Sequence, residues 1–113
     1  MTNHTSIKLI AAGFAAFAVA LGTAADVREN WTKMCARCHA ADGSGDTKAG
    51  RKLKARDYTS AEVQAKMTDE EMLKAIVEGV KDEKGKERMQ GYSEKLSEEE
   101  SKDLVAYIRT MKK

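Results

Sequence analysis

The two cysteines of the chain lie three residues apart, and a histidine directly follows the second, in the segment Cys35-Ala36-Arg37-Cys38-His39. Two thiols at this spacing lie on one turn of a helix, so each can add to a vinyl group of the same porphyrin. The adjacent imidazole then lies within reach of the metal ion at the porphyrin centre. The pattern C-x-x-C-H is typical of covalent c-type haem attachment, and it predicts a fold built around that group.

Other uses of two cysteines and one histidine agree less well with the sequence. A structural zinc site needs four ligands, and this segment supplies three. A thioredoxin-like redox pair normally lies in a βαβ unit, whose sequence pattern is missing here. A disulfide between these cysteines would close a very small loop and would stabilise the chain little. Haem attachment is therefore the preferred interpretation.

The first 25 residues have the layout of a secretory signal peptide. A polar start with one lysine precedes an apolar run from Leu9 to Gly22, and small residues follow up to Ala25. This run is too short to span a bilayer. We therefore expect export to the periplasm with cleavage near Ala25, which leaves residues 26–113 as one domain without a transmembrane segment. The alternative is a terminal helix of the domain or an uncleaved anchor.

The expected mature domain has few large side chains with which to build a core. It keeps one tryptophan and three tyrosines, since both phenylalanines lie in the predicted signal peptide. Small domains with little apolar burial usually need a disulfide, a metal or another staple, so the core is expected to include a cofactor. The formal net charge of +2 gives no field that indicates nucleic acid as the partner.

Apolar periodicity and capping residues predict a mostly helical domain. Helices are expected over residues 26–34, from Thr59 or Ser60 to 67, 68–79 and 97–111. Thr68 and Ser97 are natural N-caps, and a glutamate follows each by three residues, as in a capping box. The basic segment 48–57 and the charged segment 81–88 are expected to be irregular.

No second histidine is left after the predicted cleavage, so a methionine thioether is the obvious second axial ligand for iron. Met34 lies beside the first cysteine, on the histidine side. Met72 and Met111 lie on apolar helix faces and Met67 has the position of a hydrophobic staple, so core packing explains them. Met89 lies in a polar segment, where an apolar residue needs a reason. We predict that Met89 binds iron, and a packing contact under the loop is the alternative.

With these residues in place, the chain resembles the class I c-type cytochromes, small soluble one-haem proteins, from Trp31 to the C-terminus. The features that agree beyond the C-x-x-C-H segment are Trp31, Gly50, Leu53, Met89, Leu104 and Tyr107. Met89 precedes a glycine and an aromatic residue ahead of the last helix, as the axial methionine of that family does. One departure is Arg51, which stands where the family usually has a proline whose carbonyl accepts the N–H of the haem histidine.

The resemblance implies an all-α cytochrome c fold, with three to five helices wrapped around one covalently attached haem c. It implies thioether bonds to Cys35 and Cys38, with His39 as the proximal and Met89 as the distal iron ligand. It also implies that the first and last helices cross with their aromatic residues in contact.

The function implied is one-electron transfer between redox partners in the periplasm, by a protein that is not an enzyme and is expected to be a monomer. One alternative is a haem subunit of a dedicated dehydrogenase or oxidase. Another is an open-site haem sensor or peroxidase-like protein, if the bond to Met89 is weak. A basic stretch is the expected docking surface for an acidic partner, with an ordinary solvated loop as its alternative. The stretch consists of Lys48, Arg51, Lys52, Lys54 and Arg56.

Overall fold

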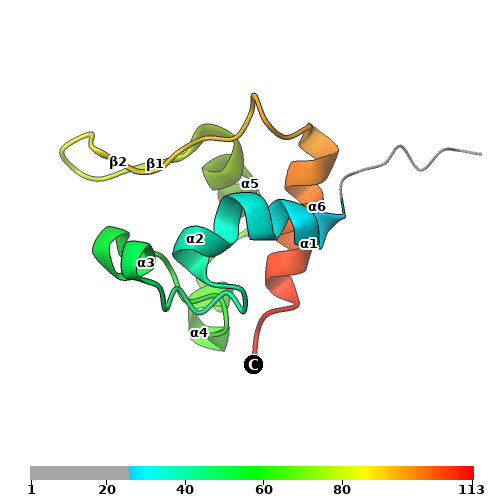
Figure 1. Ribbon diagram of the computed structural model, residues 1–113, viewed down its shortest axis with the longest axis horizontal. Helices are drawn as coiled ribbons and strands as arrows, with labels where there is room; N and C mark the ends of the chain where they lie inside the picture. The colour runs from blue at the N-terminus through cyan, green and yellow to red at the C-terminus, as the bar shows by residue number, and fades with distance from the viewer. Residues whose placement is uncertain (1–25) are drawn as a thin grey trace, which may run out of the picture.

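The computed structural model describes residues 26–113, and the predicted signal peptide lies outside the described residues. Over this range the chain forms five helical segments and one two-stranded hairpin (Figure 1). The mostly helical architecture predicted from the sequence is confirmed, while the hairpin was not expected. No helix within residues 26–113 has the length and apolar character needed to cross a membrane.

The first helical segment runs without a break through α1 (Val27–Asn30), a π-helical turn η1 (Trp31–Cys35) and α2 (Ala36–His39). The side chain of Asp26 caps its start by accepting from the N–H of Arg28. The N–H of Ala36 donates to the carbonyl of Trp31, five residues earlier, which makes the turn π-helical. Such turns occur mostly at functional sites, and this one ends at the first cysteine.

The basic segment that we expected to be irregular contains a helix, α3 (Lys48–Leu53), so that prediction was wrong. Thr47 caps it, because its hydroxyl accepts from the N–H of Gly50. A helix of six residues is too short for apolar periodicity to be visible in the sequence. Packing against α2, rather than intrinsic propensity, stabilises it.

The remaining helices begin at the residues that the sequence indicated. Ser60 caps α4 (Ala61–Ala65), Thr68 caps α5 (Asp69–Glu78) and Ser97 caps α6 (Glu98–Arg109). Only α6 carries both arms of a capping box within the described chain, since the side chain of Glu100 also accepts from the N–H of Ser97 at 3.1 Å.

The charged segment that follows α5 is also more regular than predicted. It forms an antiparallel hairpin of β1 (Val80–Lys81) and β2 (Glu87–Met89). Val80 pairs with Met89 and Lys81 pairs with Glu87, so Arg88 is the extra residue of a β-bulge. The hairpin projects from the helices on the same side of the molecule as α3 (Figure 1).

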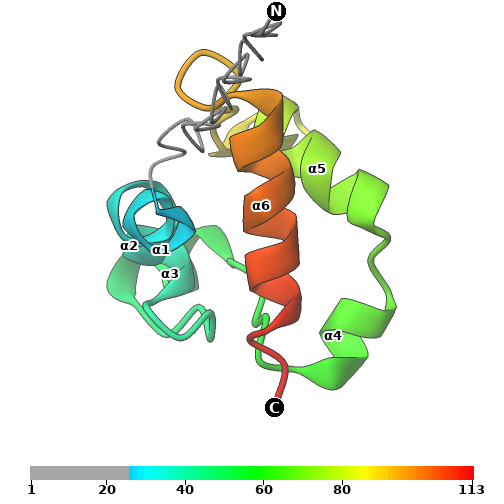
Figure 2. The same ribbon diagram turned by 90° about the vertical axis from the view of Figure 1, so that its right-hand side faces the viewer.

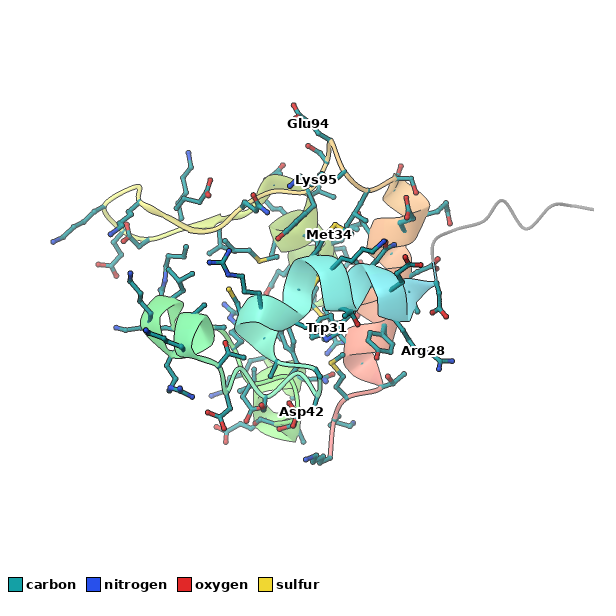
Figure 3. All side chains as sticks on the ribbon, in the orientation of Figure 1. Arg28, Trp31, Met34, Asp42, Glu94 and Lys95 are labelled. Atoms are coloured by element: carbon teal, nitrogen blue, oxygen red, sulfur yellow. The ribbon has the colours of Figure 1, made fainter. Side chains whose placement is uncertain are left out.

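The core forms where α6 crosses the first helical segment and packs on α5. Leu104 is fully buried, and Val105 and Ile108 are buried beside it. Figure 2 shows α6 with α1–α3 on one side and α4 and α5 on the other. The rings of Trp31 and Tyr107 meet edge to face with centroids 5.9 Å apart, which confirms the predicted aromatic contact. Figure 3 places Trp31 near the centre of the molecule, with Asp42 and Glu94 at its edges.

The side chains of Gln64 and Arg109 connect α4 and α5 to α6 by hydrogen bonds. The buried amide of Gln64 donates to the carbonyls of Tyr58 and Ile108 at 2.7 and 2.8 Å. The guanidinium of Arg109 donates to the carbonyls of Gln64 and Met67 and to the carboxylate of Asp69. These bonds fix the position of α5, which lines a cavity together with α2.

Candidate functional site

A cavity of about 850 Å³ opens between α2, α5, the segment after α3 and the hairpin. Its volume falls in the range of about 300–1,000 Å³ that is typical of ligand sites. The cavity is lined by Cys35, Cys38 and His39 from the first helical segment and by Met89 from the hairpin. The structure therefore brings all four predicted site residues to one cavity, although they come from two distant parts of the chain.

The two cysteines lie on one helical turn at one side of the cavity. Cys35 ends the π-helical turn and is buried, and Cys38 lies in α2 and is half-buried. Neither thiol is in a disulfide within the described part of the chain. Burial, with a smaller contribution from Cys38, raises the pKa of the Cys35 thiol to about 11. Both thiols therefore face the cavity without a disulfide that would compete for them.

His39 is buried, and a backbone carbonyl orients its ring. Its Nδ1 lies 3.3 Å from the carbonyl oxygen of Arg56, which leaves Nε2 as the nitrogen available to a metal ion. Burial lowers the pKa of His39, and the contact with Arg56 opposes that shift. In the class I family a proline carbonyl makes this contact, and Arg51 stands at that proline's position, but here the carbonyl of Arg56 makes it instead. Arg51 lies within α3, and the chain passes the imidazole only after that helix has ended.

Two aromatic rings pack against the imidazole. The ring of Tyr58 stacks on His39 with centroids 4.6 Å apart and planes at 17°. The ring of Trp31 lies 5.9 Å away, and its Nε1 donates to the carbonyl of Ala40 at 3.1 Å. By residue type alone, the sequence made Tyr58 a candidate partner of haem propionates, together with Arg56 and Tyr92. Its contact with His39 was not predicted.

The carbonyls at the end of α2 are satisfied by the loop that follows, which fixes the cysteine-bearing turn. The N–H of Gly45 donates to His39, and the hydroxyl of Thr47 lies 2.7 and 3.0 Å from the carbonyl oxygens of Arg37 and Cys38. A Cβ atom at Gly50 would overlap the carbonyl oxygen of Cys38. Only glycine therefore allows α3 to approach α2 this closely.

Met89 is half-buried at the base of the hairpin, where two glycines allow close backbone packing. A Cβ at Gly79 would lie 2.5 Å from the carbonyl oxygen of Met89, and one at Gly91 would lie 2.6 Å from that of Val77. Other methionines also line the cavity, namely Met34, Met67 and Met72, whereas Met111 does not. Met67 and Met72 are buried in the apolar core, as core packing predicts.

The rim of the cavity is basic. Its lining contains eight lysines and arginines and two glutamates. Of the predicted docking stretch, Lys54 and Arg56 belong to this lining. Lys48 and Lys52 border an adjacent hollow of about 410 Å³, together with Arg37, which also lines the main cavity. Arg51 differs, because it forms an ion pair with Asp46.

The described residues offer no alternative metal centre made of protein ligands alone. Within residues 26–113, no group of three or more histidine, cysteine, aspartate or glutamate side chains could hold a metal ion. The cavity lining offers one imidazole, two thiols and several thioethers, with two glutamates besides. This set suits a metal ion that brings most of its own ligands.

Comparison with known proteins gives a consistent result. The family model for cytochrome c matches residues 24–112. A solved structure of the KustC0563 c-type cytochrome is 38% identical, covers 78% of this chain and 99% of its own, and has a TM-score of 0.68. A tyrosine-to-phenylalanine variant of Kustc0563 is 37% identical, with coverage of 77% and 99% and a TM-score of 0.65. No curated protein matches the chain.

Proposed function

The chain belongs to the cytochrome c family of haem-based electron-transfer proteins, whose members bind covalently attached haem c, and on that basis we propose a specific role. The protein is a periplasmic one-electron carrier that holds one haem with His39 and Met89 as axial ligands. The observation that carries this proposal is the convergence of Cys35, Cys38, His39 and Met89 on a single cavity.

The residues around the cavity fit a covalently bound haem. Two free thiols lie on one helical turn at its side, and a buried imidazole with an available nitrogen lies directly after them. Met67, Met72 and Tyr92 extend the apolar core into the lining, where they give a porphyrin an apolar surface. The expectation that this core includes a cofactor agrees with this arrangement.

Bound haem supplies the one-electron chemistry at its iron. Thioether bonds from Cys35 and Cys38 would hold the group covalently, independently of the ligands to its iron. The carbonyl of Arg56 and the ring of Tyr58 hold the imidazole of His39 in one orientation. The thioether of Met89 is a soft ligand that raises the reduction potential relative to a second histidine. Fixed ligands on both sides suit electron transfer, because no group has to enter or leave.

The basic rim supports docking to an acidic redox partner. Lys54 and Arg56 border the cavity, and Lys48 and Lys52 extend the same positive surface over α3. All four side chains are exposed. Positive charge around the site of electron exit steers an acidic partner into a productive orientation and speeds encounter. Arg51 contributes less, because Asp46 already neutralises it.

The experiment that tests the ligand assignment is the optical spectrum of the haem-loaded protein. Ferric protein with a thioether ligand shows a weak near-infrared charge-transfer band from sulfur to iron, together with a low-spin spectrum. We expect the wild type to show this band, Met89→Ala to lose it, and Met72→Leu to keep it. Met72 is the matched control because it is a methionine that lines the same cavity.

Two results would contradict the proposal. Loss of the band in Met72→Leu and not in Met89→Ala would move the ligand to α5. A wild type without the band and with a high-spin ferric spectrum would favour the open-site sensor or peroxidase-like protein instead.

A further inference from the structure

The hairpin that carries Met89 packs on the core at its base but forms few hydrogen bonds to the described chain around it. The tip of the hairpin is exposed, and a Cβ added at Gly85 would meet no atom within 4 Å. An isolated two-stranded hairpin is at best marginally stable in water. Something outside the hairpin therefore has to hold β2 in place.

One side chain forms the hydrogen bonds from the hairpin to the described chain around it. Arg88 donates from Nε and Nη2 to the carbonyl oxygen of Leu53, at 3.3 and 3.1 Å. The other side-chain and turn hydrogen bonds of residues 80–89 stay within the hairpin, as in the bonds that Asp82 accepts from the N–H groups of Lys84 and Lys86. Arg88 is thus the link between the strand of Met89 and α3.

The β-bulge explains how Arg88 reaches α3 while its neighbour reaches the cavity. In a regular strand, successive side chains point to opposite faces. Arg88 is the extra residue between the pairs Val80–Met89 and Lys81–Glu87, and a bulge of this kind turns a side chain away from its regular direction. Both Arg88 and Met89 consequently line the same cavity.

The acceptor suits a guanidinium group. Leu53 is the last residue of α3, and Lys54 follows in the left-handed conformation with φ +57°. The carbonyls of the last helical turn lack partners within the helix and carry partial negative charge. A cation with two N–H groups aimed at one such oxygen is a favourable cap. Arg88 is half-buried, and this bond occupies two of its donors.

We propose that Arg88 is a positioning residue for the axial methionine. Its bond to Leu53 anchors β2 across the mouth of the cavity, and this anchor keeps the thioether of the next residue, Met89, at the iron. The inference rests on the proposed ligation by Met89. It assigns a role to a side chain in the charged segment 81–88, for which the sequence predicted only irregular structure.

The test measures how readily an added ligand displaces the thioether from ferric haem. Imidazole is titrated into the haem-loaded wild type, Arg88→Ala, Arg88→Lys and two controls, and binding is followed by loss of the near-infrared band. Lys86→Ala is the matched control, since it removes one positive charge from the same hairpin at an exposed position. Met89→Ala reports the affinity of a site without the thioether, and its binding is followed in the Soret region.

We expect Arg88→Ala to bind imidazole at least about tenfold more tightly than wild type, because hydrogen bonds from a charged group are strong. Arg88→Lys keeps the charge and one donor, so its affinity lies between the two. Lys86→Ala binds as the wild type does. Far-ultraviolet circular dichroism checks the fold, and Arg88→Lys alone carries the test if Arg88→Ala does not assemble.

Two results overturn the inference, and they differ in what they say about the ligand. If Met89→Ala binds tightly while both Arg88 variants match wild type, Met89 is the ligand and Arg88 does not position it. If Met89→Ala also matches wild type, the thioether of Met89 does not occupy the site, and the proposed ligation fails together with the role of Arg88.

Discussion

His39 is oriented by groups that lie well beyond it in the chain. The carbonyl of Arg56 fixes Nδ1, and the ring of Tyr58 covers one face of the imidazole. A hydrogen bond to the second nitrogen of a metal-binding histidine sets its orientation and raises its basicity. Both residues belong to the loop after α3, so the position of that loop determines how firmly the imidazole of His39 is held.

Two serines of α6 are expected to respond oppositely to the same substitution. The hydroxyl of Ser101 is buried and has no hydrogen-bond partner among the described residues. The hydroxyl of Ser97 accepts from the N–H of Glu100 at 3.1 Å and caps the helix. Ser101→Ala should therefore stabilise the protein by about 1 kcal/mol, because it removes an unsatisfied polar group. Ser97→Ala should destabilise it by about 1 kcal/mol.

Denaturant unfolding of the haem-loaded variants measures both changes. Equal losses in the two variants would mean that the hydroxyl of Ser101 has a partner in solution, such as a bound water molecule.

The sequence revealed residues whose chemistry is contained in one short segment. Cys35, Cys38 and His39 share one helical turn, so their spacing alone indicated their use. Arg56 and Tyr58 could not be predicted in this way, because their contacts with the imidazole depend on how the loop after α3 returns. The hydrogen-bond partner of His39 is the backbone carbonyl of Arg56, and every residue has such a carbonyl, so residue types could not indicate it.

Among the helices and strands, too, those with capping residues and apolar periodicity in the sequence were predicted, and those without were not. Thr68 and Ser97 start α5 and α6 where capping residues and apolar periodicity predicted them. The helix α3 and the hairpin were missed because both are short and rich in charge. Each depends on a tertiary contact: α3 on its packing against α2, and the hairpin on the bond from Arg88 to Leu53.

The contact between α2 and α3 is expected to tolerate no side chain at Gly50. A Cβ there would overlap the carbonyl oxygen of Cys38, which is backbone and cannot rotate away. Gly50→Ala should destabilise the protein by about 1–3 kcal/mol, the range for overpacked sites. It should also lower the yield of haem-loaded protein, because α3 would displace the turn that carries the cysteines.

Lys52→Ala is the control for Gly50→Ala, since it changes an exposed residue of the same helix. Denaturant midpoints and the haem-to-protein absorbance ratio report the two effects. A Gly50→Ala variant with the stability and haem content of Lys52→Ala would contradict the close packing of α2 and α3.

Charge is distributed unevenly over the whole molecule. The formal net charge is only +2, yet the cavity lining has eight basic and two acidic side chains. The first turns of α5 and α6 are acidic instead, with Asp69, Glu70 and Glu71 in one and Glu98, Glu99 and Glu100 in the other. Attraction for an anion therefore depends on the direction of approach more than on the total charge.

This asymmetry predicts how the reduced protein reacts with an anionic oxidant such as ferricyanide. The rate constant should fall as ionic strength rises, because salt screens attraction between opposite charges. The double variant Lys52→Glu with Lys54→Glu should react several-fold more slowly at low salt, with a weaker salt dependence.

The matched control for the basic surface is Lys102→Glu with Lys112→Glu. It makes the same change in net charge outside the cavity lining. Stopped-flow measurement gives the rate constant of oxidation by ferricyanide for both double variants. Equal slowing in the two would assign the effect to net charge and not to the surface around the cavity.

The hairpin gives the two sides of the cavity unequal resistance to opening. On one side, α2 is continuous with the helix that crosses α6, so it opens only when the core itself unfolds. On the other side, one guanidinium supplies the side-chain hydrogen bonds that tie β2 to α3, and the tip of the hairpin is exposed. Sub-global opening on that side requires far less free energy than global unfolding. Under the proposed ligation, thermal or chemical stress would release the thioether of Met89 first, while the proposed bonds from Cys35 and Cys38 would keep the haem in place, so this first step of inactivation would be reversible.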